Sequence, residues 1–202
     1  LTGGSSIDCG LAGTVMRFVP LVAALALGPV AFDGDPSARK RPMRSTIDAL
    51  RGLRVDVTDD GRGTLPFSLY GTGTVAGGPL DINASESSQF VSALLLVGAR
   101  FVNGLHLTNT GPTVPSLPHI EMTMTTLAAR GVTVTMTATH GAGKGAWSVE
   151  PGVIAARDVD IEPDLSNAAP FLAAALVAGG SVTIIGWPTA TTQVGDRLES
   201  LL

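Results

Sequence analysis

Cysteine and histidine are scarce in this sequence, and their scarcity excludes two kinds of site. The 202 residues include a single cysteine, Cys9, which excludes an internal disulfide and a zinc cluster built from cysteines. The histidines are His106, His119 and His140, and their spacing is not that of metal ligands. We therefore expect no bound metal.

An excess of positive charge and a long uninterrupted apolar run are also missing. The formal net charge is −4 and only 15% of the residues are charged, which argues against nucleic acid or an anionic membrane as a partner. The apolar stretch 15–32 contains Arg17 and Pro20 and is broken by a Gly-Pro pair, so it does not predict a membrane span. No targeting segment is visible, and the cytoplasm is the expected location.

The positive charge that is present gathers in the first quarter of the chain. Arg17, Arg39, Lys40, Arg41 and Arg44 lie close together in the sequence. A local basic cluster in an acidic chain favours a small anionic ligand over a charged polymer. A solvated charged loop remains the alternative interpretation.

The stretch Gly10-Leu-Ala-Gly-Thr-Val-Met-Arg17 predicts a tight turn that opens into an apolar helix over residues 14–27. Gly13 has no side chain, so a ligand can approach the backbone there. The start of a helix presents unpaired N–H groups and partial positive charge, which suit a phosphate or a carboxylate. Because such turns are common in α/β proteins that bind nothing, the motif alone does not decide between a binding site and a structural turn.

The chain repeats one unit three times, with a period of about 75 residues. Each copy is expected to begin with a strand, an apolar helix and a second strand. A further helix and a strand pair follow in the first two copies, and the third copy breaks off during its second helix. The expected first strands are 6–8, 80–83 and 159–161, the helices 14–27, 87–99 and 167–177, and the second strands 30–32, 105–108 and 182–185. The expected second halves are helices 42–50 and 119–127, with strand pairs 55–57/67–70 and 132–136/147–149.

The repeat predicts an α/β (α+β) fold of β-α-β-α-β-β units. The helices are rich in alanine and leucine around most of their circumference, which predicts helices buried between layers of sheet. Pro151-Gly152 marks the expected boundary between a domain at 1–155 and a second at 156–202. Leu1 is not an initiator and the expected last helix has no cap, so we interpret the chain as a fragment of a longer protein.

Three motifs in register resemble the 5-enolpyruvylshikimate-3-phosphate synthase (3-phosphoshikimate 1-carboxyvinyltransferase) family. They are Asp8-Cys-Gly-Leu-Ala-Gly-Thr-Val-Met-Arg17, Asp33-Gly-Asp-Pro-Ser-Ala-Arg-Lys-Arg-Pro42 and Ala84-Ser-Glu-Ser-Ser-Gln-Phe-Val-Ser-Ala93. The resemblance implies the enolpyruvyl transferase fold, an inside-out barrel in which each of two domains contains three such units. Residues 1–155 then belong to the upper domain, without its start, and residues 156–202 to the first unit of the lower domain.

The resemblance also implies a reaction. The family transfers the enolpyruvyl group of phosphoenolpyruvate to the 5-hydroxyl of shikimate-3-phosphate and releases phosphate, a step of the shikimate pathway to aromatic amino acids. It needs no metal and no organic cofactor. Both substrates are polyanions, which accounts for the arginines and helix starts. A monomer with these two small-molecule partners is the expected assembly.

The site residues carried over from the family fall into two groups. The phosphoenolpyruvate group is Gly13, Arg41 and Gln89. The shikimate-3-phosphate group is Ser87, Ser88, Gln89, Ser116 and His119. In the family the glutamine lies between the two substrates, and no residue of this chain matches the family's acid–base groups, which the resemblance places before Leu1 and beyond Leu202.

The chain departs from the family's pattern at two places. His119 stands where many members have a tyrosine, and it is either a phosphate donor or a neutral residue at a helix start. Phe18 replaces a proline. Arg17 fits the motif but is interpreted as a structural salt-bridge partner. Asp164 and Gln193 are interpreted as a turn-and-cap residue and a helix-flanking residue.

Two alternatives stay open. An enolpyruvyl transferase acting on UDP-N-acetylglucosamine shares the fold, but that family usually has a reactive cysteine five residues before the motif arginine. Pro36 occupies this position relative to Arg41, and Cys9 is interpreted as a core residue. The second alternative is a noncatalytic module that keeps the repeat and has lost the chemistry.

Overall fold

The computed structural model describes residues 2–138, 145–188 and 190–198. His140 and the end of the expected last helix, 199–202, lie outside the described residues. Contacts divide the chain into two compact units, residues 1–155 and 156–202. Their identity with an upper and a lower domain stays a prediction, and each unit is described by itself.

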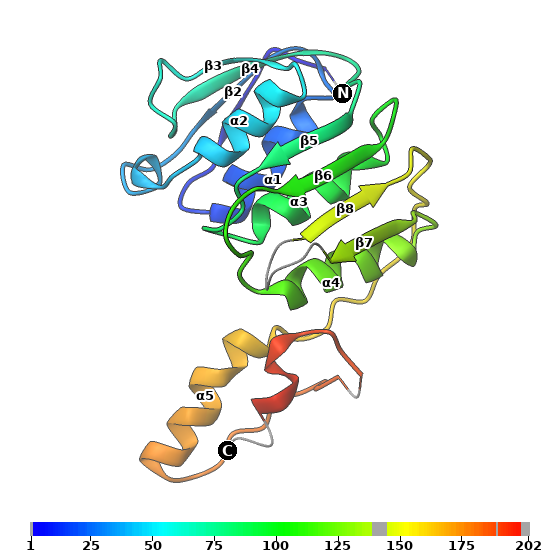
Figure 1. The fold of residues 1–202 in the computed structure, drawn as a ribbon. Coiled ribbons are helices and arrows are strands. Elements are labelled where there is room, and N and C mark those ends of the chain that lie inside the picture. Colours follow the sequence, from blue (N-terminus) through cyan, green and yellow to red (C-terminus); the bar gives the residue numbers. More distant parts are fainter. Residues whose placement is uncertain (1, 139–144, 189, 199–202) are drawn as a thin grey trace. The chain divides into compact units, whose positions relative to one another are not determined.

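The first unit contains two copies of the repeat (Figure 1). The elements of the first copy are β1 (Ser5–Asp8), α1 (Gly13–Ala23), β2 (Leu27–Asp33), η1 (Ala38–Lys40), α2 (Arg44–Gly52), β3 (Asp56–Thr58) and β4 (Phe67–Thr72). Those of the second copy are β5 (Gly78–Ile82), α3 (Gln89–Gly98), β6 (Leu105–Asn109), α4 (Leu117–Ala128), β7 (Val134–Ala138) and β8 (Gly145–Val149).

The two copies build the same sheet twice. The strand orders are β1-β2-β4-β3 and β5-β6-β8-β7. In each sheet the first two strands are parallel and joined by a crossover helix, and the remaining pairs are antiparallel. The prediction of a repeated β-α-β-α-β-β unit is therefore confirmed for these two copies.

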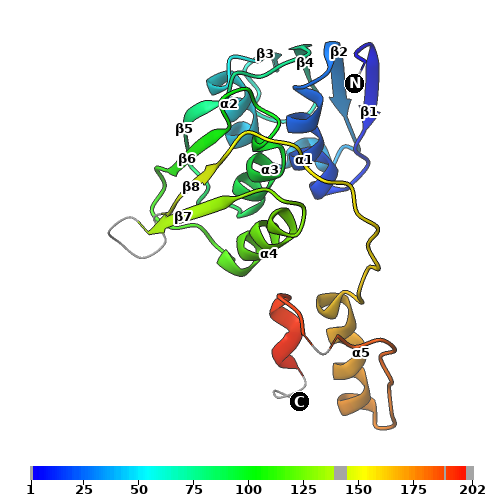
Figure 2. The same ribbon diagram turned by 90° about the vertical axis from the view of Figure 1, so that its right-hand side faces the viewer.

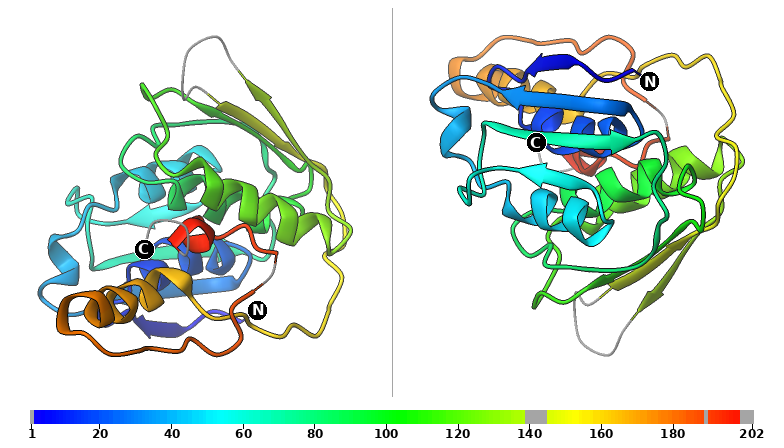
Figure 3. Two further views of the ribbon diagram at one scale, coloured as in Figure 1. Left: turned by 90° about the horizontal axis from the view of Figure 1, so that it is seen from below. Right: turned by 90° about the horizontal axis from the view of Figure 1, so that it is seen from above.

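Alternation along the strands turns one face of each sheet toward the helices. In β4, Phe67 and Leu69 are buried while Tyr70 is exposed, and in β8 Trp147 and Val149 are buried. Helix α1 contacts β2 and β4, and it lies against the first sheet in the view from above (Figure 3). The apolar face of each sheet thus packs against the helices, which lie on its inner side.

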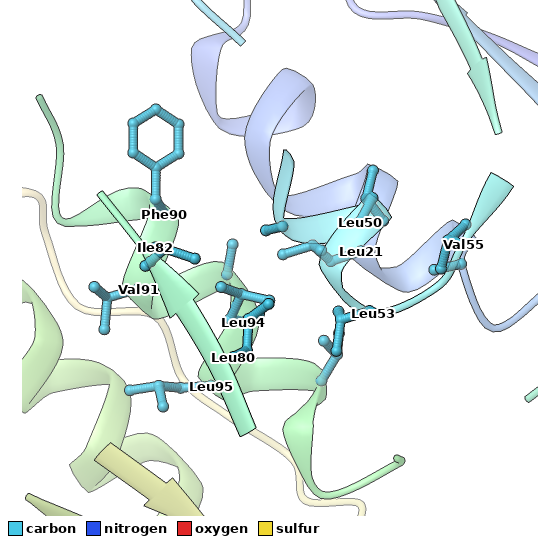
Figure 4. Close-up of a cluster of buried hydrophobic side chains, with 14 of the residues drawn as sticks. Leu21, Leu50, Leu53, Val55, Leu80, Ile82, Phe90, Val91, Leu94 and Leu95 are labelled. Atoms are coloured by element: carbon cyan, nitrogen blue, oxygen red, sulfur yellow. The ribbon is translucent and has the colours of Figure 1, made fainter. Parts of the chain in front are cut away.

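Helix α3 forms the centre of this core. Eight of its ten residues are buried, and it packs against α1, α4, β6 and β8. Figure 2 shows α1 and α3 lying between the two sheets. The close-up in Figure 4 shows Leu94 of α3 near Leu80 of β5, with Leu21 and Leu50 from the first copy close by. The predicted burial of helices between sheets is confirmed for α3.

The predicted length of the first helix was wrong. It was expected to reach Leu27, but α1 ends at Ala23. The N–H groups of Leu25 and Ala26 bond back only three residues, to Val22 and Ala23, which tightens the last turn. Leu27 then pairs with Thr72 at the start of β2, so strand pairing takes over from the helix.

The second unit contains α5 (Leu165–Ala178) and η2 (Val194–Arg197). Asp164 caps α5 because its side chain accepts hydrogen bonds from the N–H groups of Ser166 and Asn167. Gln193 also caps the start of this helix, because its Oε1 accepts a hydrogen bond from Leu165 N at 2.9 Å. The structural interpretation of Asp164 and Gln193 is confirmed.

The strands expected at 159–161 and 182–185 are absent from the described part of this unit. A strand requires a hydrogen-bonded neighbour, and neither segment pairs with a described strand. Both remain exposed, with Ile161 86% and Ile185 87% accessible. The expected burial of the third helix was also wrong, because only Leu165 and Ala168 of α5 are buried.

Candidate anion-binding site

Gly13 and the Arg41 side chain meet at the start of α1. Gly13 is the first residue of this helix, and the Arg41 Nη1 donates to the Leu11 carbonyl at 3.0 Å. A Cβ added to Gly13 would lie 3.0 Å from the same Nη1. The structure therefore brings together two residues that are 28 positions apart in the sequence.

The basic cluster seen in the sequence separates into arginines with different partners. Arg39 forms a two-bonded ion pair with Asp33, with distances of 2.8 and 2.7 Å, and this pair lowers the pKa of Asp33. Among the described residues, no carboxylate lies within ion-pair distance of Arg41. Arg41 therefore carries an uncompensated charge beside the helix start, which favours an anionic ligand.

The Ser-Ser-Gln run forms the turn that opens α3. The Oγ of Ser87 accepts from the Gln89 N–H at 3.2 Å, which holds the turn before the helix. Ser88 is 4% exposed, although its side chain makes no cap hydrogen bond. The helix was expected to begin at Ser87 and begins two residues later, so both serines precede it.

Arg17 connects the two helix starts. Its Nη1 donates to Gln89 Oε1 at 2.7 Å and lies 3.5 Å from Ser87 Oγ. Its guanidinium lies over the Phe90 ring, 5.2 Å from the centroid. Burial lowers the pKa of Arg17, and the nearby positive charge of Arg41 lowers it further. Two positive charges therefore lie near each other where α1 and α3 begin.

Three of the predicted shikimate-phosphate residues line one cavity of about 360 Å³. They are Ser88, Gln89 and His119, and Ser92 and Thr123 add further hydroxyls at its wall. Apolar side chains, including Phe18, also line this open cavity. The region thus combines a few polar groups with an apolar wall, which is typical of small-molecule sites.

Ser116 does not line this cavity. It is exposed and adopts a left-handed conformation, with φ 52°, at the residue before α4. Its carbonyl accepts from the His119 N–H at 3.0 Å. Ser116 therefore shapes the start of the helix that carries His119, and its predicted contact with a phosphate stays a prediction.

The loop after Arg41 borders a second cavity, of about 490 Å³. Its wall carries charge of both signs, from Lys40, Arg44, Arg62, Asp48 and Glu86. This mixture of charges favours a polyanion less than the start of α1 does, where Arg41 has no carboxylate partner among the described residues. The side of the loop where Arg41 contacts Leu11, just before α1, is therefore the better candidate for an anion site.

Asp59 holds the loop 59–63, which contacts the residue before α2. Its buried carboxylate accepts from Arg51 Nη2 at 2.7 Å and from the N–H groups of Gly61 and Gly63. The Gly63 carbonyl in turn accepts from Met43 N, just before α2. The Arg51 guanidinium holds the pKa of Asp59 at about 2. The sequence offers no signal for this role of an aspartate in a loop.

We expect Asp59→Asn to lower the free energy of unfolding by about 1–2 kcal/mol at pH 7. The pKa of Asp59 is lowered on folding, so its contribution is complete above its usual pKa of 3.8 and is lost as the pH falls toward about 2. Urea unfolding of both proteins between pH 7 and pH 3 measures this difference, which should shrink below about pH 4. A constant difference across that range would contradict the role given to the carboxylate.

Other chemistry finds little support in the described residues. No group of three or more acidic, histidine or cysteine side chains there could hold a metal ion. Burial raises the pKa of the Cys9 thiol, and Asp8 adds to the effect, so this buried cysteine stays protonated at neutral pH. No described helix is both long enough and apolar enough to cross a membrane.

Comparison with known proteins assigns the chain to a family. A family model described as EPSP synthase (3-phosphoshikimate 1-carboxyvinyltransferase) matches residues 2–201. The chain belongs to the EPSP synthase family. The repeat and the fold class predicted from the sequence agree with this membership.

Relatives of the EPSP synthase family show how much of such a protein the chain spans. A 3-phosphoshikimate 1-carboxyvinyltransferase of Kocuria rhizophila is 55% identical over 197 residues, which are 97% of this chain and 43% of that protein. Two structures of the Acinetobacter baumannii EPSP synthase match with a TM-score of 0.65 and 26% identity, over 86% of this chain and 37% of theirs. The chain spans less than half the length of the relatives that it matches.

Within the EPSP synthase fold, sequence reasoning missed one contact at the site. Arg17 was interpreted as structural, and its hydrogen bond to Gln89 was not anticipated. The signal was present, because Arg17 in the second turn of α1 and Gln89 at the first residue of α3 both lie near the start of an apolar helix in successive repeats. Residues at equivalent places of packed repeats come close when the helices run side by side, as α1 and α3 do.

Proposed function

We propose that this chain is part of an enzyme that transfers the enolpyruvyl group of phosphoenolpyruvate to the 5-hydroxyl of shikimate-3-phosphate and releases phosphate. The observation that carries the proposal is that two helix starts with residues suited to anions lie near each other. Gly13 and Arg41 lie at one, Ser88 and Gln89 at the other, and Arg17 joins them at 2.7 Å from Gln89. A reaction between two polyanions requires two such places side by side.

Each helix start takes one substrate in this proposal. The guanidinium of Arg41 binds the anionic groups of phosphoenolpyruvate, and Gly13 leaves room for that substrate against the backbone. Ser87 and Ser88 bind the phosphate of shikimate-3-phosphate, with Ser116 and His119 as further contacts from the start of α4. Gln89 lies between the substrates and contacts both.

The chemistry divides between binding and proton transfer. The 5-hydroxyl attacks C2 of phosphoenolpyruvate as C3 is protonated, and phosphate then leaves. The residues of this chain hold the two reactants in place, which removes much of the entropic barrier to their encounter. The acid–base groups are proposed to come from parts of the enzyme other than residues 1–202.

The proposal extends to organisation and location. Residues 1–155 form part of the upper domain and residues 156–202 the first unit of the lower domain. The enzyme is a monomer of the cytoplasm that binds neither nucleic acid nor membranes, and it uses no metal or organic cofactor. The net charge of −4 supports the absence of a nucleic-acid partner.

Phosphate release by the complete enzyme tests the proposed function. We expect release that depends on both phosphoenolpyruvate and shikimate-3-phosphate, with no release when UDP-N-acetylglucosamine replaces the latter. Residues 1–202 alone should release none. Activity with UDP-N-acetylglucosamine would support the enolpyruvyl transferase that acts on that substrate. If neither phosphoenolpyruvate nor shikimate-3-phosphate raised the melting temperature, a noncatalytic module would be supported.

We expect Gly13→Ala to raise the KM for phosphoenolpyruvate about tenfold, which corresponds to about 1.4 kcal/mol, and to change the KM for shikimate-3-phosphate little. The added methyl group would meet only Arg41 Nη1, at 3.0 Å, so the guanidinium must move away from its place. Steady-state kinetics with each substrate varied in turn measures the effect. Gly152→Ala is the matched control, because a Cβ there meets nothing within 4 Å.

A further inference from the structure

Arg17 makes contacts that a merely structural arginine does not need. Its Nη1 reaches Gln89 Oε1 at 2.7 Å, the short distance of a charge-assisted hydrogen bond. Among the described residues it forms no ion pair. Its Nε is buried and makes no hydrogen bond, although a buried unpaired N–H is costly. The guanidinium is therefore held by the hydrogen bond from Nη1 to Gln89 and by the Phe90 ring that it lies over.

This contact decides which way the Gln89 amide points. A glutamine side chain can usually be turned end for end, because its oxygen and nitrogen have the same shape. An arginine has donors and no acceptor, so only the oxygen of Gln89 can face it. The NH₂ group of Gln89 must then point away from Arg17.

The other end of Gln89 is available to a ligand. Gln89 lines the cavity that also holds Ser88 and His119. The described residues provide no hydrogen-bond acceptor for its NH₂ group, whereas its oxygen is occupied by Arg17. An NH₂ group is a donor only, which suits the oxygens of an anion. The positive charge of Arg17 beside the amide oxygen also polarises the amide and strengthens this donor.

We propose that Arg17 is a positioning residue that fixes the Gln89 amide with its NH₂ group directed at the bound substrates. The inference rests on the proposed function, since it concerns how the same site holds its two anions. Arg17 acts through Gln89 rather than by touching a substrate. Ser87, 3.5 Å from Arg17 Nη1 and bonded to the Gln89 N–H, restrains the same turn.

A double-mutant cycle on the complete enzyme tests this inference. We expect Arg17→Met and Gln89→Ala each to lower kcat/KM by about 10- to 100-fold. The double variant should be no worse than Gln89→Ala alone, because removing Arg17 has no effect once the amide is gone. Arg17→Lys should recover part of the loss. Arg130→Met should match the wild type. Arg130 is a half-buried arginine just after α4, and among the described residues its side chain bonds to the Thr126 carbonyl alone.

Gln89→Glu separates orientation from folding. A glutamate keeps an acceptor for Arg17 but has no NH₂ group, so kcat/KM should fall at least as far as in Gln89→Ala while the melting temperature is not lowered. This arm holds even if Arg17→Met fails to fold. Wild-type-like activity of Gln89→Glu would overturn the inference.

The outcomes distinguish the inference from the function beneath it. If the single losses multiply in the double variant, Arg17 acts independently of Gln89, by contacting a substrate or by general stabilisation, and the inference is wrong while the function stands. If the unmodified enzyme releases no phosphate with both substrates, the proposed function itself fails and the inference falls with it.

Discussion

Arg41→Ala in the complete enzyme is expected to raise the KM for phosphoenolpyruvate by a factor that corresponds to about 2–5 kcal/mol. The KM for shikimate-3-phosphate should change far less. Arg41 lies beside the first residue of α1, and among the described residues it has no carboxylate partner, so its charge is free for a ligand. Its removal leaves the bound anion without its counter-charge.

Two further variants make this prediction specific. Arg41→Lys keeps the charge but loses the planar fork, so it should fall between the wild type and alanine. Ser88→Ala should show the reverse pattern, with a smaller loss that falls mainly on shikimate-3-phosphate, because one neutral hydroxyl contributes less than a charge. Equal weakening of both substrates by Arg41→Ala and by Ser88→Ala would contradict the division of the site.

Leu94→Ala is expected to lower the free energy of unfolding by about 2–5 kcal/mol. Leu94 is 1% exposed and belongs to α3, the helix that packs against elements of both copies of the repeat. Figure 4 shows its side chain in the centre of the aliphatic cluster. A cavity there cannot be filled by one neighbouring element without disturbing another, so the surroundings relax little.

Native-state hydrogen exchange of the α3 amides measures this loss, because it reports the opening free energy of that helix within the complete protein. Leu27→Ala is the matched control, since Leu27 is 68% exposed, and it should change stability by less than about 0.5 kcal/mol. A similar loss in both variants would mean that α3 is not the centre of the core.

The elements with local signals were predictable from the sequence. The apolar run 90–98 and the alternation around Trp147 reflect burial on helix and strand, and both elements lie where expected. The absence of strands at 159–161 and 182–185 was not predictable. Their patterns resemble those of the first two copies, but the structure shows no pairing for them among the described residues. Pairing is a property of neighbours rather than of a segment.

The candidate site shows the same division. Gly13, Arg41 and the Ser-Ser-Gln run carry motifs, so the sequence located them. The hydrogen bond between Arg17 and Gln89 and the loop held by Asp59 depend on distances between separate segments, which no local pattern encodes. The motifs therefore identified the candidate binding residues, and the packing of α1 against α3 brings Arg17 and Gln89 together.

Hydrogen exchange of the complete enzyme with each substrate in turn tests whether the two helix starts hold different anions. Shikimate-3-phosphate alone should protect the backbone amides of residues 87–90. Phosphoenolpyruvate alone should instead protect the amides of residues 11–14 and 41, because the two substrates together would react. Protection at neither helix start, or the same protection of both by shikimate-3-phosphate alone, would contradict the site proposed for this chain.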